Sequence, residues 1–408
     1  WPTGWAPGCA TRPARYGADR IWRNAAGEET KAPRHVAAQI WTAYSPQRDW
    51  SDIVKQFLAA HAKQKVGDNG PMQGFVNETK GETWKEDFEH TEAEHLANRA
   101  RAEALPVGVV PRGACVLVAG MDVQGDRWEM SVVAVGRGME TWVIDHRIVY
   151  GNTAEQSEWE SKVEPLLALT YPHASGARLN LSAVAIDTGH QTHQAYTFCR
   201  KHQRSKVYAV KGDTEPWKPI KARRSLMDVN ERGRKIRKGV ALWHVGTDTA
   251  KDLLHGRLQL EIHGPGFVHF AARLSPAFFD HFTAEQRVPQ RTTRGVEHRW
   301  VLPSGRRNEE LDCYVYAMFC MEVLDMNSWT DRVWQNLERT LEPDLFSAPA
   351  SEPPASVHTH APPPPEPDAP ISAPAPAAPA AKPIPRPAAP VRRQAPPSIA
   401  SSDWSDRL

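Results

Sequence analysis

The stretch VLVAGMDVQGDRW, residues 116–128, runs from a continuous apolar segment through Asp122 into a turn that contains glycine. An apolar run of this length, bounded by turn residues, is typical of a strand buried on both faces. LSAVAIDTGHQT, residues 181–192, repeats the pattern and places Asp187 at the end of its apolar run. A third aspartate, Asp312, lies in an apolar stretch at residues 306–324 that we expect to be helical.

The segments around these aspartates predict the fold class. Apolar runs at residues 116–124, 127–136 and 139–150 are separated by short polar turns with glycine, which predicts a meander of antiparallel strands. Further along the chain we expect helix 155–169, strand 182–187, helix 192–203, strand 206–212, helix 248–260, strand 267–270, a helix after Pro276 and helix 308–324. Hairpins that lead into a β-α-β section predict an α/β protein with a mixed sheet flanked by helices.

Composition divides the 408 residues into five segments. We expect an irregular N-terminal segment, a first structured part with a linker, the main domain, a C-terminal helix and a tail, at residues 1–34, 35–105, 106–328, 329–342 and 343–408. The first structured part has a strand-like run at 40–44, a helix from about residue 49, a short strand from residue 75 and a charged helix at 89–105. Pro, Ala and Ser dominate the tail, which cannot bury enough apolar surface to offset its ordering entropy, so we expect it to be disordered.

The three aspartates predict a metal centre. Buried carboxylates lose hydration and repel one another, so a cluster of three calls for a cation that offsets both effects. Oxygen ligands suit Mg²⁺ or Mn²⁺, and three strands followed by a helical crossover would bring Asp122 and Asp187 side by side. The helix of Asp312 would pack on the sheet through Tyr316 and Phe319. We therefore expect a two-metal site that cleaves phosphodiesters, with the carboxylates within about 5 Å of one another.

Each of the other polar residues near these motifs has a functional and a purely structural interpretation. His190 and His193 either contact a phosphate or shuttle a proton, or they belong to an ordinary turn into a helix. Lys211 either faces the scissile phosphate or is an ordinary lysine at a strand end. Glu309 and Glu310 suit the first turn of a helix because of its dipole, and Glu309 is also a candidate accessory metal ligand. An aspartate at a strand end is itself commonly a turn former or a helix cap.

Charge is balanced overall but concentrated in one stretch. Fifty basic residues against 48 acidic ones give a net charge of +2, whereas residues 218–238 hold nine Lys or Arg and two acids. This stretch is the candidate surface for DNA phosphates, with Arg223, Arg224, Arg234 and Lys235 as contacts, and a solvated loop is the alternative.

Several function classes are excluded or disfavoured by what the sequence lacks. The five cysteines form no CxxC pair, which disfavours a zinc ribbon and suits a reducing compartment. The chain contains no phosphate-binding loop of the G-x-x-x-x-G-K-[ST] type and no G-x-S-x-G elbow. No apolar run reaches the length of a membrane span and no secretion signal opens the chain, so we expect a soluble protein that is not secreted.

Five ordered motifs resemble a known family. HVAAQIWTAYSPQRDW, FVNETKGETWKE, GMDVQGDRWE, AIDTGHQTHQAY and GRRNEELDCYVYA, spread over residues 35–324, are similar to the large terminase subunit of tailed bacteriophages, of the lambda-like type. In that family an ATPase motor drives DNA into the prohead, and a nuclease of ribonuclease-H-like fold cuts concatemeric double-stranded DNA with divalent metal. The resemblance places Asp122, Asp187 and Asp312 on the acidic nuclease positions.

The resemblance has further implications. Residues 35–105 correspond to the end of the α/β motor domain, and the rest of the motor, with its ATP site, would lie upstream of Trp1, where an N-terminal methionine is missing. The small terminase subunit and the portal protein are the implied partners, the latter through the tail, with the protein in the bacterial cytoplasm and transiently at the prohead. The alternatives are a transposase or integrase core that performs strand transfer, and a packaging or docking protein that is not an enzyme.

Overall fold

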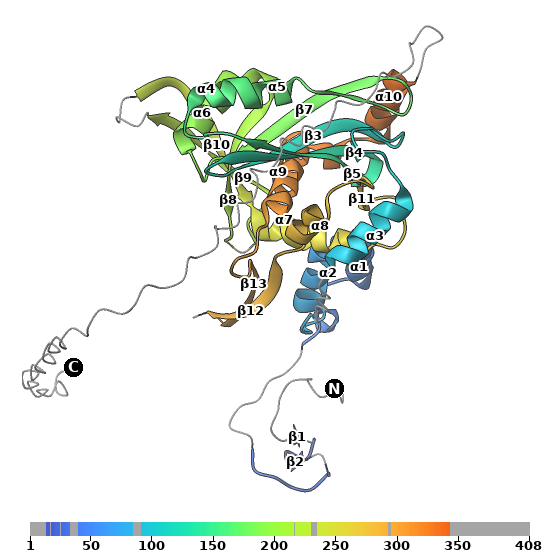
Figure 1. Ribbon diagram of the computed structural model, residues 1–408. Helices are drawn as coiled ribbons and strands as arrows, with labels where there is room; N and C mark the ends of the chain where they lie inside the picture. The colour runs from blue at the N-terminus through green and yellow to red at the C-terminus, as the bar shows by residue number, and fades with distance from the viewer. Residues whose placement is uncertain are drawn as a thin grey trace, which may run out of the picture. The chain divides into compact units, whose positions relative to one another are not determined.

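The computed structural model describes residues 14–16, 18–24, 26–32, 40–84, 91–215, 217–229, 235–292 and 295–342. The expected disordered tail at residues 343–408 lies outside this part of the chain. A central sheet has the order β11-β5-β4-β3-β7-β8-β10-β9, with β6 paired to β7 (Figure 1). Its strands are β3 (Ala114–Val123), β4 (Arg127–Gly136), β5 (Thr141–Tyr150), β6 (Thr170–Pro172), β7 (Arg178–Asp187), β8 (Val207–Asp213), β9 (Lys221–Val229), β10 (Lys235–Gly246) and β11 (Val268–Phe270).

The sheet is mixed, as the sequence predicted. β3, β4 and β5 pair antiparallel in a meander, and β3 also pairs parallel with β7, which is followed by parallel β8 and β10. β3 therefore lies where the antiparallel part of the sheet meets the parallel part. Edge strand β11 is parallel to β5, and edge strand β9 is antiparallel to β10.

Helices cover both faces of the sheet (Figure 1). Helix α9 (Glu309–Val323) packs on one face with α3 (Ala93–Glu103), α7 (Thr247–Leu258), α8 (Pro276–Phe282) and α10 (Asp331–Leu341). The other face is covered by α6 (Thr192–Lys201) and by the consecutive segments α4 (Gln156–Glu158), η4 (Trp159–Val163) and α5 (Glu164–Leu167). Successive residues of β3 alternate between the two cores, because side chains of a strand point to opposite faces: Val116 and Val118 face α9, whereas Leu117 and Ala119 face α6.

One glycine sets the distance between α9 and the sheet. A Cβ atom on Gly120 would lie 1.9 Å from the carbonyl oxygen of Cys313 and 2.7 Å from the backbone nitrogen of Ala317. The backbone of α9 thus rests directly on β3, two residues before Asp122 and one residue after Asp312. This contact brings the end of β3 and the first turn of α9 together.

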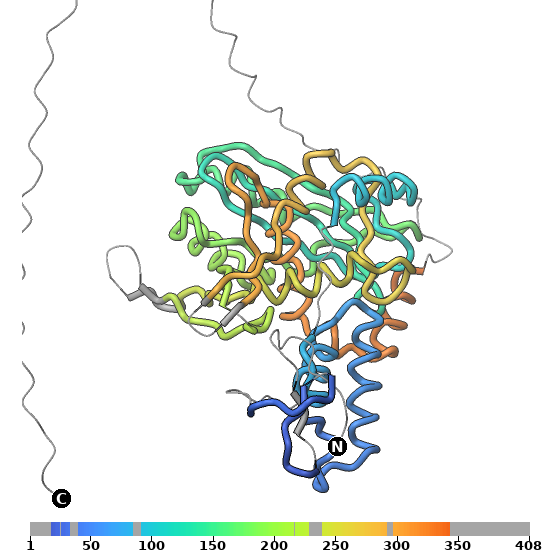
Figure 2. Tube along the Cα trace, turned by 90° about the horizontal axis from the view of Figure 1, so that it is seen from below, coloured from blue at the N-terminus to red at the C-terminus, as the bar shows by residue number. Residues whose placement is uncertain are grey.

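The first structured part differs from the sequence prediction. Residues 40–44 were expected to be strand-like, but they contain a short 3₁₀ helix, η1 (Thr42–Tyr44), before α1 (Trp50–Gln64), the long blue helix in Figure 2. The expected strand from residue 75 is wrong as well, because α2 (Gly70–Gly74) continues into a π-helical turn, η2 (Phe75–Thr79). Phe75 joins a small core with Ile53 and Met72, so packing against α1 favours a helical turn over an extended segment.

The described parts of the basic stretch, residues 218–238, lie mainly in two paired strands, whereas a solvated loop was the alternative expected from the sequence. β9 and β10 form a hairpin whose second strand is held by its parallel partner β8 and buries Val240 and Leu242. Two further strand pairs were not predicted, β1 (Ala14–Tyr16) with β2 (Trp22–Asn24) and β12 (Gln286–Thr292) with β13 (Gly295–Val301). The expected helices at 89–105, 248–260, 308–324 and 329–342 are confirmed by α3, α7, α9 and α10.

Two smaller expectations can be compared with the described residues. Cys115, Cys199, Cys313 and Cys320 are free and buried, whereas Cys9 lies outside the described part. No helix among the described residues combines the length and the apolar character that a bilayer crossing requires.

Candidate active site

Asp122 and Asp187 lie side by side at the ends of two neighbouring strands. β3 and β7 run parallel with Met121 opposite Ile186, so the next residue of each strand is an aspartate. The exposed fractions are 6% for Asp122 and 7% for Asp187. The predicted juxtaposition of these two carboxylates is therefore confirmed, because the carboxyl ends of parallel strands meet at one edge of a sheet.

Asp312 enters the same electrostatic environment from α9. Burial raises the pKa of Asp122 well above its ordinary value, and the charges of Asp187 and Asp312 raise it further. Burial also raises the pKa of Asp312, Lys251 partly offsets this effect, and Glu285 and Asp187 add to it. The Asp312 side chain remains 25% exposed, so solvent reaches the carboxylates from the side of the helix.

Neighbouring groups hold two of the aspartates in place. The Tyr316 hydroxyl donates to Asp187 Oδ1 at 3.0 Å, and the backbone N–H of Gly189 donates to its Oδ2 at 2.8 Å. These bonds lower the pKa of Asp187, but its burial outweighs them and the net shift is upward. The Gln124 amide donates to Asp122 Oδ2 at 2.6 Å.

A buried lysine accompanies Asp312. Lys251 Nζ lies 2.6 Å from Glu285 Oε1 and 3.3 Å from Asp312 Oδ1, and the Asn308 amide donates to Asp312 Oδ2 at 2.9 Å. Burial favours the neutral amine of Lys251, but the charges of Asp312 and Glu285 outweigh it and raise its pKa. Lys251 was not among the site residues predicted from the sequence, although its spacing to Leu254 and Leu258 places it on the buried face of α7.

The donor chemistry of the three aspartates fits hard divalent ions. Carboxylate oxygens are the ligands that Mg²⁺ and Mn²⁺ prefer, and a cation would offset the burial that raises the pKa of all three aspartates and the repulsion that adds to it at Asp122 and Asp312. In the described residues, three other groups of Asp, Glu, Cys or His have ligand atoms within 4.8 Å of one another, and the aspartates do not form such a group. The expected separation of about 5 Å among the three carboxylates is therefore not confirmed, although two ions about 4 Å apart can be held by outer ligands roughly 8 Å from each other.

The accessory candidates have different surroundings. His190 is exposed, and its Nε2 lies 3.5 Å from the position of a Cβ on Gly125, in the turn that follows Asp122. His193 is exposed on α6. Glu309 is buried and its carboxylate is held by Arg127 at 2.7 Å and by Arg307 at 3.1 Å, which leaves it in an ion-pair network.

The predicted DNA contacts are described only in part. Lys211 on β8 and Arg223 and Arg224 on β9 are exposed, and the Arg224 guanidinium lies 5.8 Å from the ring centre of Trp243. Arg234 lies outside the described residues, and Lys235 begins β10 with a side chain that is also outside them.

Comparisons with known proteins agree with this arrangement. The profile of the family described as "Terminase large subunit gpA, endonuclease domain" matches residues 35–334. The terminase large subunit of Escherichia phage lambda is 34% identical over 314 residues, which cover 74% of this chain and 46% of that protein. The corresponding subunit of Enterobacteria phage P21 is 31% identical over 310 residues, with the same two coverages of 74% and 46%.

The chain spans about half the length of these two relatives. The crystal structure of the HK97 bacteriophage large terminase matches 71% of this chain and 56% of that chain, at 10% identity and a TM-score of 0.30. The family match covers the whole sheet and all three aspartates. This chain therefore belongs to the family of the terminase large subunit gpA endonuclease domain.

Proposed function

We propose that this chain is a divalent-metal-dependent endonuclease that cuts concatemeric double-stranded viral DNA during genome packaging. One observation carries the proposal: Asp122 and Asp187 end neighbouring parallel strands, and Asp312 of α9 lies close enough for its charge, with that of Asp187, to raise the pKa of Asp122. Membership of the gpA endonuclease family supports cleavage of DNA as the reaction. The order of strand, strand and helix also suits a ribonuclease-H-like core.

In this proposal Asp122 and Asp187 hold a shared Mg²⁺ or Mn²⁺ ion, and Asp312 completes a second site. When bound, the two ions supply an activated water for attack on phosphorus and stabilise the leaving oxygen. Tyr316 orients Asp187 through its hydrogen bond, and Lys251 orients Asp312 through its ion pair. Fixed orientation favours catalysis because ligand oxygens then need little rearrangement to reach the geometry of the transition state.

The wider role is inferred from the family. Residues 35–105 would be the end of an ATPase motor domain, and ATP would act through that motor and not through the aspartate site. We propose the small terminase subunit and the portal as partners, with residues 343–408 as a tether and a docking element for the portal. Exposed Lys211, Arg223 and Arg224 would contact the DNA backbone beside the active site.

Replacement of Asp122 by Asn tests the proposed metal site. The variant keeps the side-chain shape but loses the charge, so cleavage of supercoiled plasmid in Mn²⁺ should fall at least about a hundredfold, which equals roughly 2.7 kcal/mol of transition-state stabilisation. Thermal stability without metal should be unchanged or higher, because repulsion among the three carboxylates is relieved. Asp52→Asn is the control, since Asp52 lies on α1 and pairs with Lys55 at the surface. An Asp122→Asn protein that nicks plasmid at the wild-type rate would refute the proposal.

A further inference from the structure

A second cluster of potential ligands lies under the first turn of α9, beside the aspartates. Its members are Glu129 on β4, His146 on β5 and Glu310 on α9, and their ligand atoms lie within 4.8 Å of one another. Glu129 is the cross-strand neighbour of Asp122. The exposed fractions are 0% for Glu129, 9% for His146 and 2% for Glu310, so the cluster is shielded from solvent.

Two buried atoms of this cluster have no hydrogen-bond partner among the described residues. They are Glu129 Oε2 and His146 Nε2, which lie 3.7 Å apart, and His146 Nε2 is also 3.7 Å from Glu310 Oε1. These distances are too long for an N–H···O hydrogen bond. They are close to the spacing of about 3.4 Å that separates two ligands of one tetrahedral ion at about 2.1 Å from the metal.

The surrounding side chains orient the three ligand atoms toward one point. His146 Nδ1 lies 3.0 Å from the hydroxyl oxygen of Ser131, and an Nδ1–H donated to this oxygen leaves a lone pair on Nε2. His281 Nδ1 lies 2.9 Å from both carboxylate oxygens of Glu310. Arg127 Nε and Arg307 Nη2 both contact the other oxygen of Glu129, Oε1, at 2.5 Å, and Oε2 accepts no hydrogen bond from the described residues. Ligands supported in this way are typical of metal sites.

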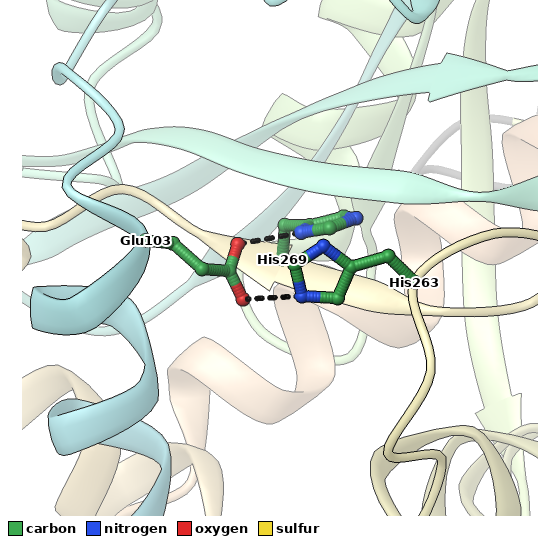
Figure 3. Close-up of side chains that lie close together, drawn as sticks. All are labelled: Glu103, His263 and His269. Carbon is green, nitrogen blue, oxygen red and sulfur yellow. Dashed lines mark hydrogen bonds and ion pairs between the residues drawn. The ribbon is translucent and has the colours of Figure 1, made fainter.

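The other His-containing groups are less suited to an ion. In the group of Glu103, His263 and His269, each oxygen of the Glu103 carboxylate faces one of the two rings (Figure 3). Both nitrogens of His269 face carboxylate oxygens, Nδ1 that of Glu103 at 2.5 Å and Nε2 that of Glu140 at 2.9 Å. A ring that donates from both nitrogens offers no lone pair to a metal. The third group uses Glu309, both of whose carboxylate oxygens are paired, Oε1 with Arg127 and Oε2 with Arg307, whereas the two arginines at Glu129 both contact Oε1.

We propose that Glu129 Oε2, His146 Nε2 and Glu310 Oε1 bind one divalent transition-metal ion of the Zn²⁺ type, separate from the ions of the aspartate site. One imidazole with two carboxylates is a donor set that suits zinc better than magnesium. Such an ion would fasten the first turn of α9 to β4 and β5, and so hold the helix that carries Asp312. This inference does not depend on the proposed DNA cleavage.

The test measures uptake of Zn²⁺ by the full chain. Asp122→Asn/Asp187→Asn serves as the parent, so that the aspartate site does not contribute ligands, and the protein is stripped with EDTA before it is titrated with ZnCl₂. The parent should bind a single ion per chain, measured by metal analysis after gel filtration, and Co²⁺ in its place should give the visible absorption of a nitrogen-ligated site. His146→Leu, added to the parent, should abolish this ion. His263→Leu is the matched control at the group of Figure 3 and should retain it.

A second variant covers the case in which the buried His146→Leu protein does not fold. His281 is not a ligand but contacts Glu310, so His281→Leu should weaken Zn²⁺ binding about 10- to 100-fold without removing the site. Failure of the parent to take up Zn²⁺ would overturn the proposal. Loss of the ion in His263→Leu instead of His146→Leu would also overturn it. Plasmid nicking by the chain with native aspartates is measured separately, so either proposal can fail alone.

Discussion

Replacement of Gly120 by alanine would test how the contact between α9 and β3 builds the active site. The new methyl group would lie 1.9 Å from the carbonyl oxygen of Cys313, whereas an ordinary contact begins at 3.4 Å. The helix and the strand must therefore separate by roughly 1.5 Å, since both neighbouring atoms belong to the backbone and no rotamer change can relieve the clash. Because Asp122 and Asp312 adjoin the two contact points, the separation would move one carboxylate away from the other.

The expected magnitudes follow from this displacement. Overpacking a close contact costs about 1–3 kcal/mol, which corresponds to a melting temperature lower by about 2–12 °C for a domain of this size. A misplacement of about 1 Å in a catalytic group can reduce the rate about a hundredfold. Cleavage should therefore fall far more than the loss of folded protein explains.

Thermal unfolding and plasmid nicking at a temperature where the variant is fully folded would check this prediction. Gly74→Ala is the control, because Gly74 has helical angles of φ −58 and ψ −45 and nothing lies within 4 Å of its added Cβ. The control should be more stable by about 0.4–1 kcal/mol and should cleave normally. A Gly120→Ala protein with unchanged stability and unchanged cleavage would show that the close approach of α9 does not set the site.

The remaining predictions concern pH and salt. Burial lowers the pKa of His173 below 6.5, so the unfolded chain binds a proton that the folded chain does not, and stability should fall below pH 6.5 by at most about 1.4 kcal/mol per pH unit from this group. In His173→Gln the free energy of unfolding, measured from denaturation curves, should fall less steeply between pH 7.5 and pH 5. An unchanged slope would contradict the assignment of this pH dependence to His173. Neutralising Arg223 and Arg224 should reduce the slope of log K against log salt for DNA binding by about one unit per lost phosphate contact. Lys201 lies on α6 and its charge is paired with Glu160 and Glu164, so Lys201→Gln should leave that slope as it is. Equal slopes in all variants would exclude β9 as the DNA surface.

The central part of the fold was predictable because its signals are local. Asp122 and Asp187 end apolar runs, and the helical crossover after the three-stranded meander was expected to place their strands side by side, as the pairing of β3 with β7 confirms. Helix α9 was predictable for the same reason, with Tyr316 on the face that contacts Asp187. The error at Phe75 arose because a short apolar run has no periodicity of its own, and packing against α1 decided its conformation.

The parts of the site that escaped prediction depend on partners far away in the chain. The burial of the Lys251 charge is explained by its ion pairs with Asp312 and Glu285, and that of Glu129 by its contacts with residues of β5 and α9. Residue spacing within one element does not predict pairs between distant elements. The β9–β10 hairpin was missed because the many charges of residues 218–238 concealed the alternation of a strand on the sheet edge. The domain boundaries stay predictions, as do the catalytic roles of the three aspartates.

The burial of α9 restricts how the sequence of this protein can change. From Glu309 to Met321 every residue of this fully described helix is buried except Asp312. Water and substrate can therefore meet the helix over this length at a single carboxylate, while the other positions are filled by packing on all sides. Almost every substitution in such a helix would disturb packing. Changes in DNA recognition should therefore come from the strand ends and hairpins around Asp312. Laboratory evolution of altered cutting should accordingly accumulate its substitutions in the turn after β3, the turn after β7 and the β9 edge, and leave the helix unchanged.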